Sequence, residues 1–283
     1  MKENIKKTIV VCISTLLLAS CGSQKKDEVN SSLIKETTET QGEKVENKSI
    51  LKTGKESFIV YSKNKLDSNE ITLEYAYYSL VDDGKCDAAY KDSINQLVAD
   101  FIYAVSDMGE ERKRPIFSME MFDESLPLFN SYYQEMIKDE IASTQPPWLL
   151  RSNISISEGD STVLVITRSY SYTGGAHGNE FVIYTIISKN DGGELKLNDF
   201  IQDVSSLNLL ASSILRKDRN IDKNQNLADA GFWIDDESNF LNDNFYFENG
   251  DLVFLFNQYE IASYADGQIE IRIPQNGLKR FLK

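Results

Sequence analysis

The sequence predicts an α+β fold of two small domains, in which antiparallel sheets pack against a few helices. Strand-like stretches occur in pairs separated by turn residues, which is typical of antiparallel hairpins. Blocks with apolar residues at spacings of three and four interrupt these stretches and indicate amphipathic helices. About 230 residues follow the polar N-terminal region, a length that favours two small domains over one.

The N-terminus has the pattern of a bacterial lipoprotein signal. Three lysines precede a short apolar run that is too brief to span a bilayer. The run ends in LASC, which resembles a lipobox, where the chain is cleaved before Cys21 and the thiol is acylated, for example with palmitate. A conventional signal peptide with an incidental cysteine is the alternative. We expect residues 1–20 to be a signal peptide and lipid on Cys21 to anchor the mature protein to the membrane.

Residues 21–54 form a polar, charged stretch that we expect to be a disordered tether. The stretch has too few apolar side chains to fold by itself. Its charged run QKKDE, at 24–28, resembles an export tag that sends lipoproteins of Gram-negative bacteria to the cell surface. The expected location is therefore the cell envelope, at the outer membrane, with exposure at the cell surface.

The N-terminal domain is expected over residues 55–188. ESFIVYSK and ITLEYAYYSL mix β-branched and aromatic residues with period-two stretches and predict two strands. Asp87 can cap a helix that runs to about Ser106, and a second helix is expected over about 122–141. LLRSNISIS and TVLVITRSYSYT then predict a hairpin, and EFVIYTIIS follows as a further strand.

The C-terminal domain is expected over residues 189–283. A Gly192-Gly193 turn leads into a helix over about 204–219, whose apolar residues again form one face. NFYFENGDLVFLF predicts a hairpin that turns at Asn249-Gly250. QIEIRIP alternates cleanly and predicts a last strand with one buried face.

The charge of the chain limits its partners. The formal net charge is −14, so the surface repels nucleic acid and attracts basic partners at long range. A second reading is that the acidity only keeps an envelope protein soluble. No internal disulfide is expected, because Cys86 is the one cysteine left after the signal peptide and the lipid site. Acidic neighbours of Cys86 would raise the pKa of its thiol, which argues against a nucleophile.

Residue types that catalysis needs are scarce. His177 is the only histidine, and no Gly-x-Ser-x-Gly elbow is present. One His and one free Cys do not supply a zinc site, and the Asp222-x-Asn224-x-Asn226 run lacks the glycine and glutamate of a calcium loop. We predict no catalytic residue, no metal and no cofactor. Paired carboxylates for glycoside hydrolysis stay open as an alternative, since the chain has 44 acidic residues.

The stretch SYSYTGGAHGNEF, at 169–181, supplies the candidate binding residues. It lies between two predicted strands, and its Gly-Gly pair can supply the positive φ angles of a tight connection. Arg168, Tyr170 and Tyr172 share one face of the incoming strand, and tyrosine and arginine are residue types that anchor interfaces. Packing of this tyrosine face against the helices is the alternative. The ligand-binding candidates are Tyr170, Tyr172, Gly174, Gly175, His177 and Asn179. We expect His177 either to order a recognition turn or to contact the ligand from it.

Three signatures occur in order along the chain: YTGGAHGN at 172–179, LNDF at 197–200 and FNQYEIASYADG at 256–267. They resemble those of a family of extracytoplasmic modules that includes the lysozyme-sensing anti-sigma factor RsiV and the non-catalytic region of the peptidoglycan deacetylase PdaC. The resemblance covers about residues 56–281. The residues of the third signature that carry it are Gln258, Tyr259, Glu260, Tyr264 and Gly267.

The resemblance implies a PdaC-like N-terminal domain, an RsiV-like C-terminal domain, and binding without turnover. We expect no polysaccharide deacetylase domain, membrane-spanning helix or sigma-binding segment, and therefore a recognition module on a lipid anchor. The expected ligand is a basic protein of the lysozyme type or a cell-wall glycan such as peptidoglycan. A weak carboxylate-dependent hydrolase and a purely structural lipoprotein are the alternatives.

Overall fold

The computed structural model describes residues 49–53, 57–66, 69–106, 116–118, 120–121, 131–132, 135 and 148–283. The expected signal peptide, the lipid site at Cys21 and residues 22–48 of the expected tether lie outside the described residues, as does most of the second expected helix at 122–141. No helix in the described ranges is both long and apolar enough to cross a membrane.

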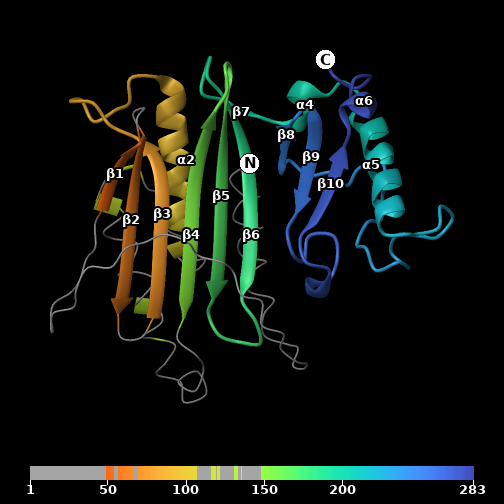
Figure 1. The fold of residues 1–283 in the computed structure, drawn as a ribbon, viewed down its shortest axis with the longest axis horizontal. Helices are drawn as coiled ribbons and strands as arrows, with labels where there is room; N and C mark the ends of the chain where they lie inside the picture. The colour runs from red at the N-terminus through yellow and green to blue at the C-terminus, as the bar shows by residue number, and fades with distance from the viewer. Residues whose placement is uncertain are drawn as a thin grey trace.

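The chain forms an α+β fold with two sheets that lie side by side (Figure 1). The larger sheet follows chain order: β1 (Ser49–Thr53), β2 (Ser57–Leu66), β3 (Asn69–Tyr78), β4 (Leu149–Glu158), β5 (Thr162–Tyr172), β6 (Asn179–Ser188) and β7 (Glu194–Leu195). The smaller sheet has the order β10 (Ile269–Ile273), β9 (Asp251–Phe256) and β8 (Phe245–Glu248). The helices are α2 (Ala89–Ser106), α4 (Leu197–Phe200), α5 (Val204–Asp218) and α6 (Gln275–Leu278), with a 3-10 turn η2 (Tyr264–Asp266).

The expected fold class is confirmed, with one refinement in the larger sheet. Its strand pairs are antiparallel except β3–β4, which is parallel. Parallel neighbours need a crossover connection, and α2 lies within the connection from β3 to β4. β1 lies inside the range 21–54 that was expected to be a tether, so the sheet begins before residue 55.

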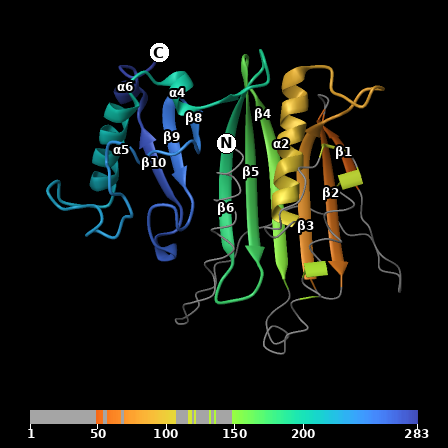
Figure 2. The same cartoon turned by 180° about the vertical axis from the view of Figure 1, so that it is seen from behind.

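Helix α2 covers one face of the larger sheet (Figure 2). Its residues Ile94, Val98 and Ile102 are fully buried, because their spacing of three and four places them on the same side of the helix, as the apolar periodicity predicts. Phe101 packs edge to face on Phe181 of β6, with ring centroids 5.9 Å apart. The first core therefore lies between α2 and this face of the sheet.

Helix α5 covers the smaller sheet and forms the second core. It begins at a cap in which Asp203 Oδ1 accepts the N–H of Ser206 at 3.0 Å. The predicted hairpin turn is confirmed, since Asn249 and Gly250 both have positive φ, at 53° and 88°. The helix expected over about 204–219 is therefore α5, and the last expected strand is β10.

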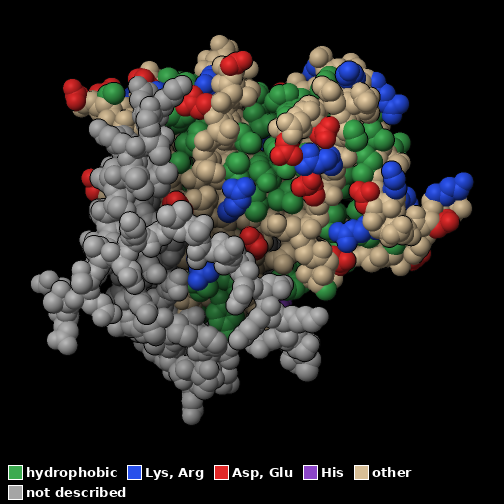
Figure 3. Space-filling view, in the orientation of Figure 1, with side chains coloured by type: hydrophobic (Ala, Val, Ile, Leu, Met, Phe, Trp, Pro, Cys, Tyr) green, Lys and Arg blue, Asp and Glu red, His purple; other side chains and the backbone are tan. Residues whose placement is uncertain are grey.

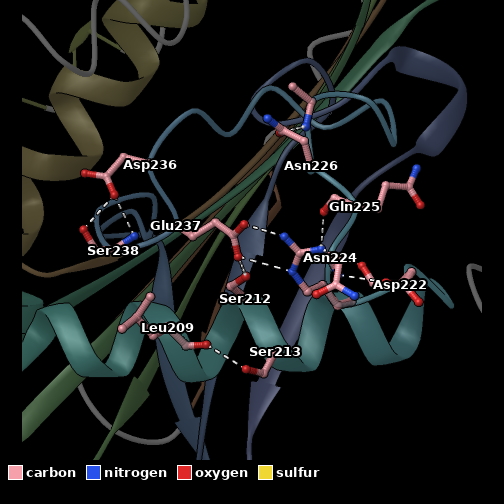
Figure 4. Close-up of polar contacts among 12 residues, drawn as sticks. Leu209, Ser212, Ser213, Asp222, Asn224, Gln225, Asn226, Asp236, Glu237 and Ser238 are labelled. Carbon is pink, nitrogen blue, oxygen red and sulfur yellow. Dashed lines mark hydrogen bonds and ion pairs between the residues drawn. The ribbon is translucent and has the colours of Figure 1, made fainter.

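A long loop connects α5 to β8, and Glu237 in this loop lies against Ser212 of the helix (Figure 4). Arg216 of α5 also holds the loop. The guanidinium donates to the main-chain oxygens of Asp222 and Gln225, at 3.1 and 2.8 Å, and pairs with the Glu237 carboxylate. Ser212 also donates to Glu237. The hydrogen bonds from Arg216 hold the pKa of Glu237 below its usual range, so this network keeps its charges at neutral pH.

Hydrophobic side chains also gather where the two sheets meet (Figure 3). Ile186 of β6 belongs to the core under α5, and Leu164 of β5 packs against that core. The ring centroids of Tyr184 on β6 and Tyr246 on β8 lie 4.3 Å apart across this boundary between the two sheets, which we call the joint. We call the smaller sheet, with the helices and loops packed on it, the smaller module. It partly covers the face of β5 and β6 that points away from α2.

Glu158, at the end of β4, links two elements of the larger sheet. It accepts the Tyr78 hydroxyl at 2.7 Å and pairs with Lys189 at 2.8 Å. These hydrogen bonds, chiefly that of Lys189, lower the pKa of Glu158. A lowered carboxyl pKa contributes stability above the unfolded-state pKa, and this contribution is lost as the pH falls through the folded-state pKa.

We therefore expect Glu158→Gln to be less stable than the wild type at pH 7, with the difference shrinking as the pH approaches 3. Urea unfolding of both proteins across this range measures it. A difference that stayed constant down to the lowest pH would show that the charge of Glu158 does not stabilise the fold.

Candidate functional site

The outer edge of β6 is capped by side-chain amides of the smaller module, because β7 pairs only with its last part. Asn257 accepts the N–H of Val182 at 2.7 Å and donates to the same residue's carbonyl at 3.0 Å. Asn244 accepts the N–H of Tyr184 at 2.8 Å and donates to the Val182 carbonyl at 2.9 Å. Each amide thus supplies the donor and acceptor that a neighbouring strand would provide.

A second layer of hydrogen bonds orients Asn257, which is 3 % exposed. The Glu260 carboxylate accepts its main-chain N–H at 3.0 Å and its side-chain N–H at 3.4 Å, together with an N–H of Asn242 at 3.2 Å. Gln268 donates to Asn257 Oδ1 at 3.1 Å. Burial raises the pKa of Glu260, and the hydrogen bonds oppose this rise. Glu260 is therefore a structural acceptor of the third signature.

The connection between β5 and β6 spans residues 173–178, and its Gly-Gly pair has the positive φ angles that the sequence predicted. Gly174 and Gly175 have φ of 99° and 88°, and the Tyr172 hydroxyl donates to the Gly175 carbonyl at 3.1 Å. Gly178 serves close packing: a Cβ there would lie 2.3 Å from the Tyr170 hydroxyl. The tyrosines of the incoming strand therefore brace the turn that follows it.

His177 stacks on Tyr264, and this contact joins two signatures that are distant in sequence. The ring centroids are 3.6 Å apart and the planes meet at 17°. The Tyr264 hydroxyl donates to the Gly178 carbonyl at 2.9 Å, and His177 Nδ1 lies 3.1 Å from the same oxygen. The only histidine is thus half-buried in the joint between the two modules.

Two more rings extend this stack toward solvent. Tyr259 lies 5.6 Å from Tyr264 and 6.5 Å from Trp233, measured between ring centroids. Trp233, in the loop after α5, is 56 % exposed, and its main-chain N–H donates to the Ile261 carbonyl at 2.8 Å. We call the rings of His177, Tyr264, Tyr259 and Trp233 the aromatic row.

The backbone of Tyr259 is unusual, with φ of 66°. Bulky residues rarely adopt this left-handed conformation, and they keep it where the surrounding structure imposes it, often at functional sites. Asn257 and Glu260 hold the chain on either side of it. The position of the Tyr259 ring is therefore set by the fold around it.

Exposed carboxylates lie on the segments that carry the aromatic row. Glu180 follows the β5–β6 turn, Asp235 follows Trp233 and Asp266 follows Tyr264. Burial is the main cause that raises the pKa of Tyr264, and the charge of Glu180 adds to it. The segments that carry the aromatic row therefore also carry negative charge.

The structure brings most of the candidate residues together, although several of them serve the joint itself. Tyr170, Tyr172 and His177 surround the turn, and the third signature packs beside it. Asn179 is 6 % exposed, and Gly267, with φ of 69°, ends η2. Three residues of the site were not among the candidates: Asn244 and Asn257, whose amides cap the edge of β6, and the exposed Trp233. Asn257 stood inside the third signature, and no pattern distinguished the other two.

Cys86 is buried beside α2, where Asn95 donates to its sulfur at 3.1 Å. Burial raises the pKa of its thiol to about 12, with Asp92 as the next cause. The expected direction is confirmed, but burial exceeds the effect of the neighbouring charges. In the described part of the chain, no group of three or more His, Cys, Asp or Glu side chains is placed to hold a metal ion.

We expect His177→Ala to have a local effect, because the histidine stacks on one ring and both modular cores lie elsewhere. Loss of the stack should cost about 1 kcal/mol, a fall of about 2–4 °C in melting temperature. Thermal unfolding measures it. A fall beyond about 10 °C would make His177 a major stabilising residue of the joint.

Fold and site together define a two-module α+β protein whose signature segments meet at the joint between the modules. Residues 187–276 match the model of a family described as "Protein of unknown function (DUF3298)". This range begins at the end of β6 and contains most of the smaller module, including Trp233 and the third signature. No curated protein matches the chain.

Solved structures of DUF3298 proteins share the fold over most of the chain. A member of this family from Bacteroides fragilis superposes with a TM-score of 0.58 at 21 % identity, covering 85 % of this chain and 96 % of that one. A DUF3298 family protein from Pseudomonas aeruginosa superposes with a TM-score of 0.52 at 16 % identity, covering 80 % of this chain and 94 % of that one. At these identities the likeness establishes the fold.

Proposed function

We propose that the protein is a lipid-anchored binding protein of the bacterial cell envelope and that its ligand is a basic protein of the lysozyme type. The proposal is carried by the meeting of two signature segments, 172–179 and 256–267, at one partly exposed aromatic row. Both segments resemble those of the modules that include RsiV and PdaC. Aromatic rings held rigidly at a surface are typical anchors of protein interfaces.

Charge supports a basic ligand. The formal net charge of the chain is −14, and exposed Glu180, Asp235 and Asp266 lie on the segments that carry the aromatic row. Lysozymes are basic, and opposite charges raise the rate of association more than the affinity. A cell-wall glycan is the second candidate ligand, favoured by the exposed ring of Trp233, since aromatic side chains commonly line ligand sites.

The surroundings of the reactive groups support binding without turnover. The His177 ring is stacked on Tyr264, the Cys86 thiol is buried with a raised pKa, and the Glu260 carboxylate accepts hydrogen bonds from asparagine side chains. Each group has a structural contact in place of a position facing a substrate. The alternative, a weak carboxylate-dependent hydrolase of envelope polysaccharide, predicts release of sugar fragments from purified peptidoglycan.

Lipid on Cys21 provides the anchor in this proposal, and the polar stretch that follows holds the folded modules away from the outer membrane. Labelling of growing cells with a radioactive fatty acid tests it. The full chain should incorporate label and the Cys21→Ala variant should not. Equal labelling of both would remove the anchor from the proposal.

Binding to an immobilised basic lysozyme, at low and at moderate salt, tests the ligand. The same lysozyme with acetylated lysines is the matched control, because acetylation removes the positive charges. We expect saturable binding that weakens with salt and is lost on the acetylated protein. Trp233→Ala should weaken binding by about thirtyfold, as truncation of an interface anchor does.

Phe247→Ala is the control variant, since Phe247 is also an exposed aromatic residue but lies on β8. It should bind as the wild type does. Binding to peptidoglycan in place of every basic lysozyme would assign the row to a glycan. Release of sugar fragments, abolished by single Asp or Glu changes, would make the protein an enzyme.

A further inference from the structure

We propose that Trp233 and Tyr259, the outer end of the aromatic row, form a cation-binding subsite. Its ligand is the ammonium or guanidinium group of a Lys or Arg side chain on a basic protein. The identity of that partner rests on the proposed function. The proposal adds the chemical group that this end of the row receives.

The two rings lie against each other as a nearly parallel pair. Their centroids are 6.5 Å apart and their planes meet at 13°. A cation is attracted to an aromatic ring when it lies over the ring face within about 6 Å of the centroid, and the solvent-exposed indole of Trp233 offers such a face, with Tyr259 packed beside it. Trp233 is 56 % exposed, and the indole is the ring that attracts cations most strongly.

Backbone contacts hold the pair in position before a ligand arrives. The hydrogen bond from Trp233 N–H to the Ile261 carbonyl ties the loop after α5 to the segment that carries Tyr259. The pairing of Arg216 with Glu237 fixes the same loop against α5. Little ordering is therefore needed on binding, which favours affinity.

The segments that carry the pair contain acidic residues, which suits a cationic ligand. Exposed Asp235 lies two residues from Trp233, and exposed Asp266 follows the neighbouring ring of Tyr264. Within the part of the chain that the structure describes, the protein's own cation–π contacts lie on other rings, among them those of Tyr78, Tyr90 and Phe281. Long-range attraction from the acidic surface would concentrate cations at the subsite.

Tryptophan fluorescence of the full chain can test the subsite without any protein partner. The chain has two tryptophans, and Trp148 is 5 % exposed, so Trp233 is the one that reports on a soluble ligand. We expect tetramethylammonium chloride to change the fluorescence saturably, with half-saturation at about 30 mM. Sodium chloride at the same ionic strength should not, and Trp233→Phe should remove the change.

Tyr259→Asn is the decisive variant, because asparagine tolerates the left-handed backbone while the ring is lost. Its half-saturation concentration should rise at least about threefold, because the indole of Trp233 loses the ring that packs beside it. Phe247→Leu is the matched control and should titrate as the wild type does. Absence of a saturable change beyond that of sodium chloride, or the same half-saturation in Tyr259→Asn, would overturn the proposal.

Two competition experiments identify the kind of molecule that carries the cation. A peptide of four arginines should compete with tetramethylammonium, and phosphocholine vesicles should not. Competition by the vesicles alone would overturn the assignment to a protein side chain. Since lysozyme is absent from the titration, a negative result beside intact lysozyme binding removes only the subsite. A positive titration without lysozyme binding removes only the lysozyme-type partner.

Discussion

Asn257→Asp is expected to destabilise the protein by about 3 kcal/mol or more at pH 7, a fall of at least about 6 °C in melting temperature. The substitution keeps the shape of the side chain but replaces its N–H donors with a carboxylate oxygen. That oxygen would face the Val182 carbonyl, now 3.0 Å from the amide, and the Glu260 carboxylate, now 3.4 Å away. Thermal or urea unfolding measures the loss.

The same variant should respond to pH in a way that reports on the mechanism. Two carboxylates in contact raise the pKa of one of them, so acidification to about pH 5 protonates the pair in part and restores a donor. The stability gap to the wild type should narrow there. Asn239→Asp adds the same charge at an exposed position and should change stability little. A loss below about 1 kcal/mol at pH 7 would show that the amide does not clamp the two modules.

Gly178→Ala should cost about 2 kcal/mol, because the added Cβ would lie 2.3 Å from the Tyr170 hydroxyl and 2.4 Å from the ring carbon that bears it. The tyrosine ring is rigid and must move as a unit. The carbonyl of residue 178 also accepts the Tyr264 hydroxyl, so displacement of the turn should reach the aromatic row. Thermal unfolding and near-ultraviolet circular dichroism measure the two effects.

A second substitution separates overpacking from other causes. In the Tyr170→Leu background, Gly178→Ala should cost at least about 1 kcal/mol less, since the obstructing ring is gone. Gly277→Ala is the control, because a Cβ there would have its nearest contact at an ordinary 3.6 Å and lies in a helix. Equal costs in both backgrounds would mean that contact with Tyr170 is not the reason for the glycine.

Elements that depend on residues close together in the sequence could be predicted from the sequence. The turn at Asn249-Gly250 was predictable because only a few residue types accept two successive positive φ angles. The inward face of α2 was predictable because spacing of three and four puts Ile94 and Val98 on the same side. The parallel pairing of β3 with β4 has no such local signal, since it depends on how a crossover folds back.

The candidate site was likewise predictable in part. The sequence showed that the β5–β6 turn and the 256–267 segment are special, but it assigned His177 only a local role in the turn. In the structure, that ring stacks on Tyr264, 87 positions further along the chain. Trp233 completes the row from a third segment, and an exposed ring in a loop has no pattern that distinguishes it.

By itself, the sequence determined the α+β class, the hairpins, the two long helices α2 and α5, the acidity of the chain and its scarcity of catalytic residue types. The tertiary structure alone decided that asparagine side chains replace a strand along β6 and that four rings from three segments form one row. Periodicity and turn chemistry act within a few residues, whereas Val182 and Asn257 meet across 75 positions. Such long-range polar contacts follow from the packing of two cores and become visible when the chain is folded.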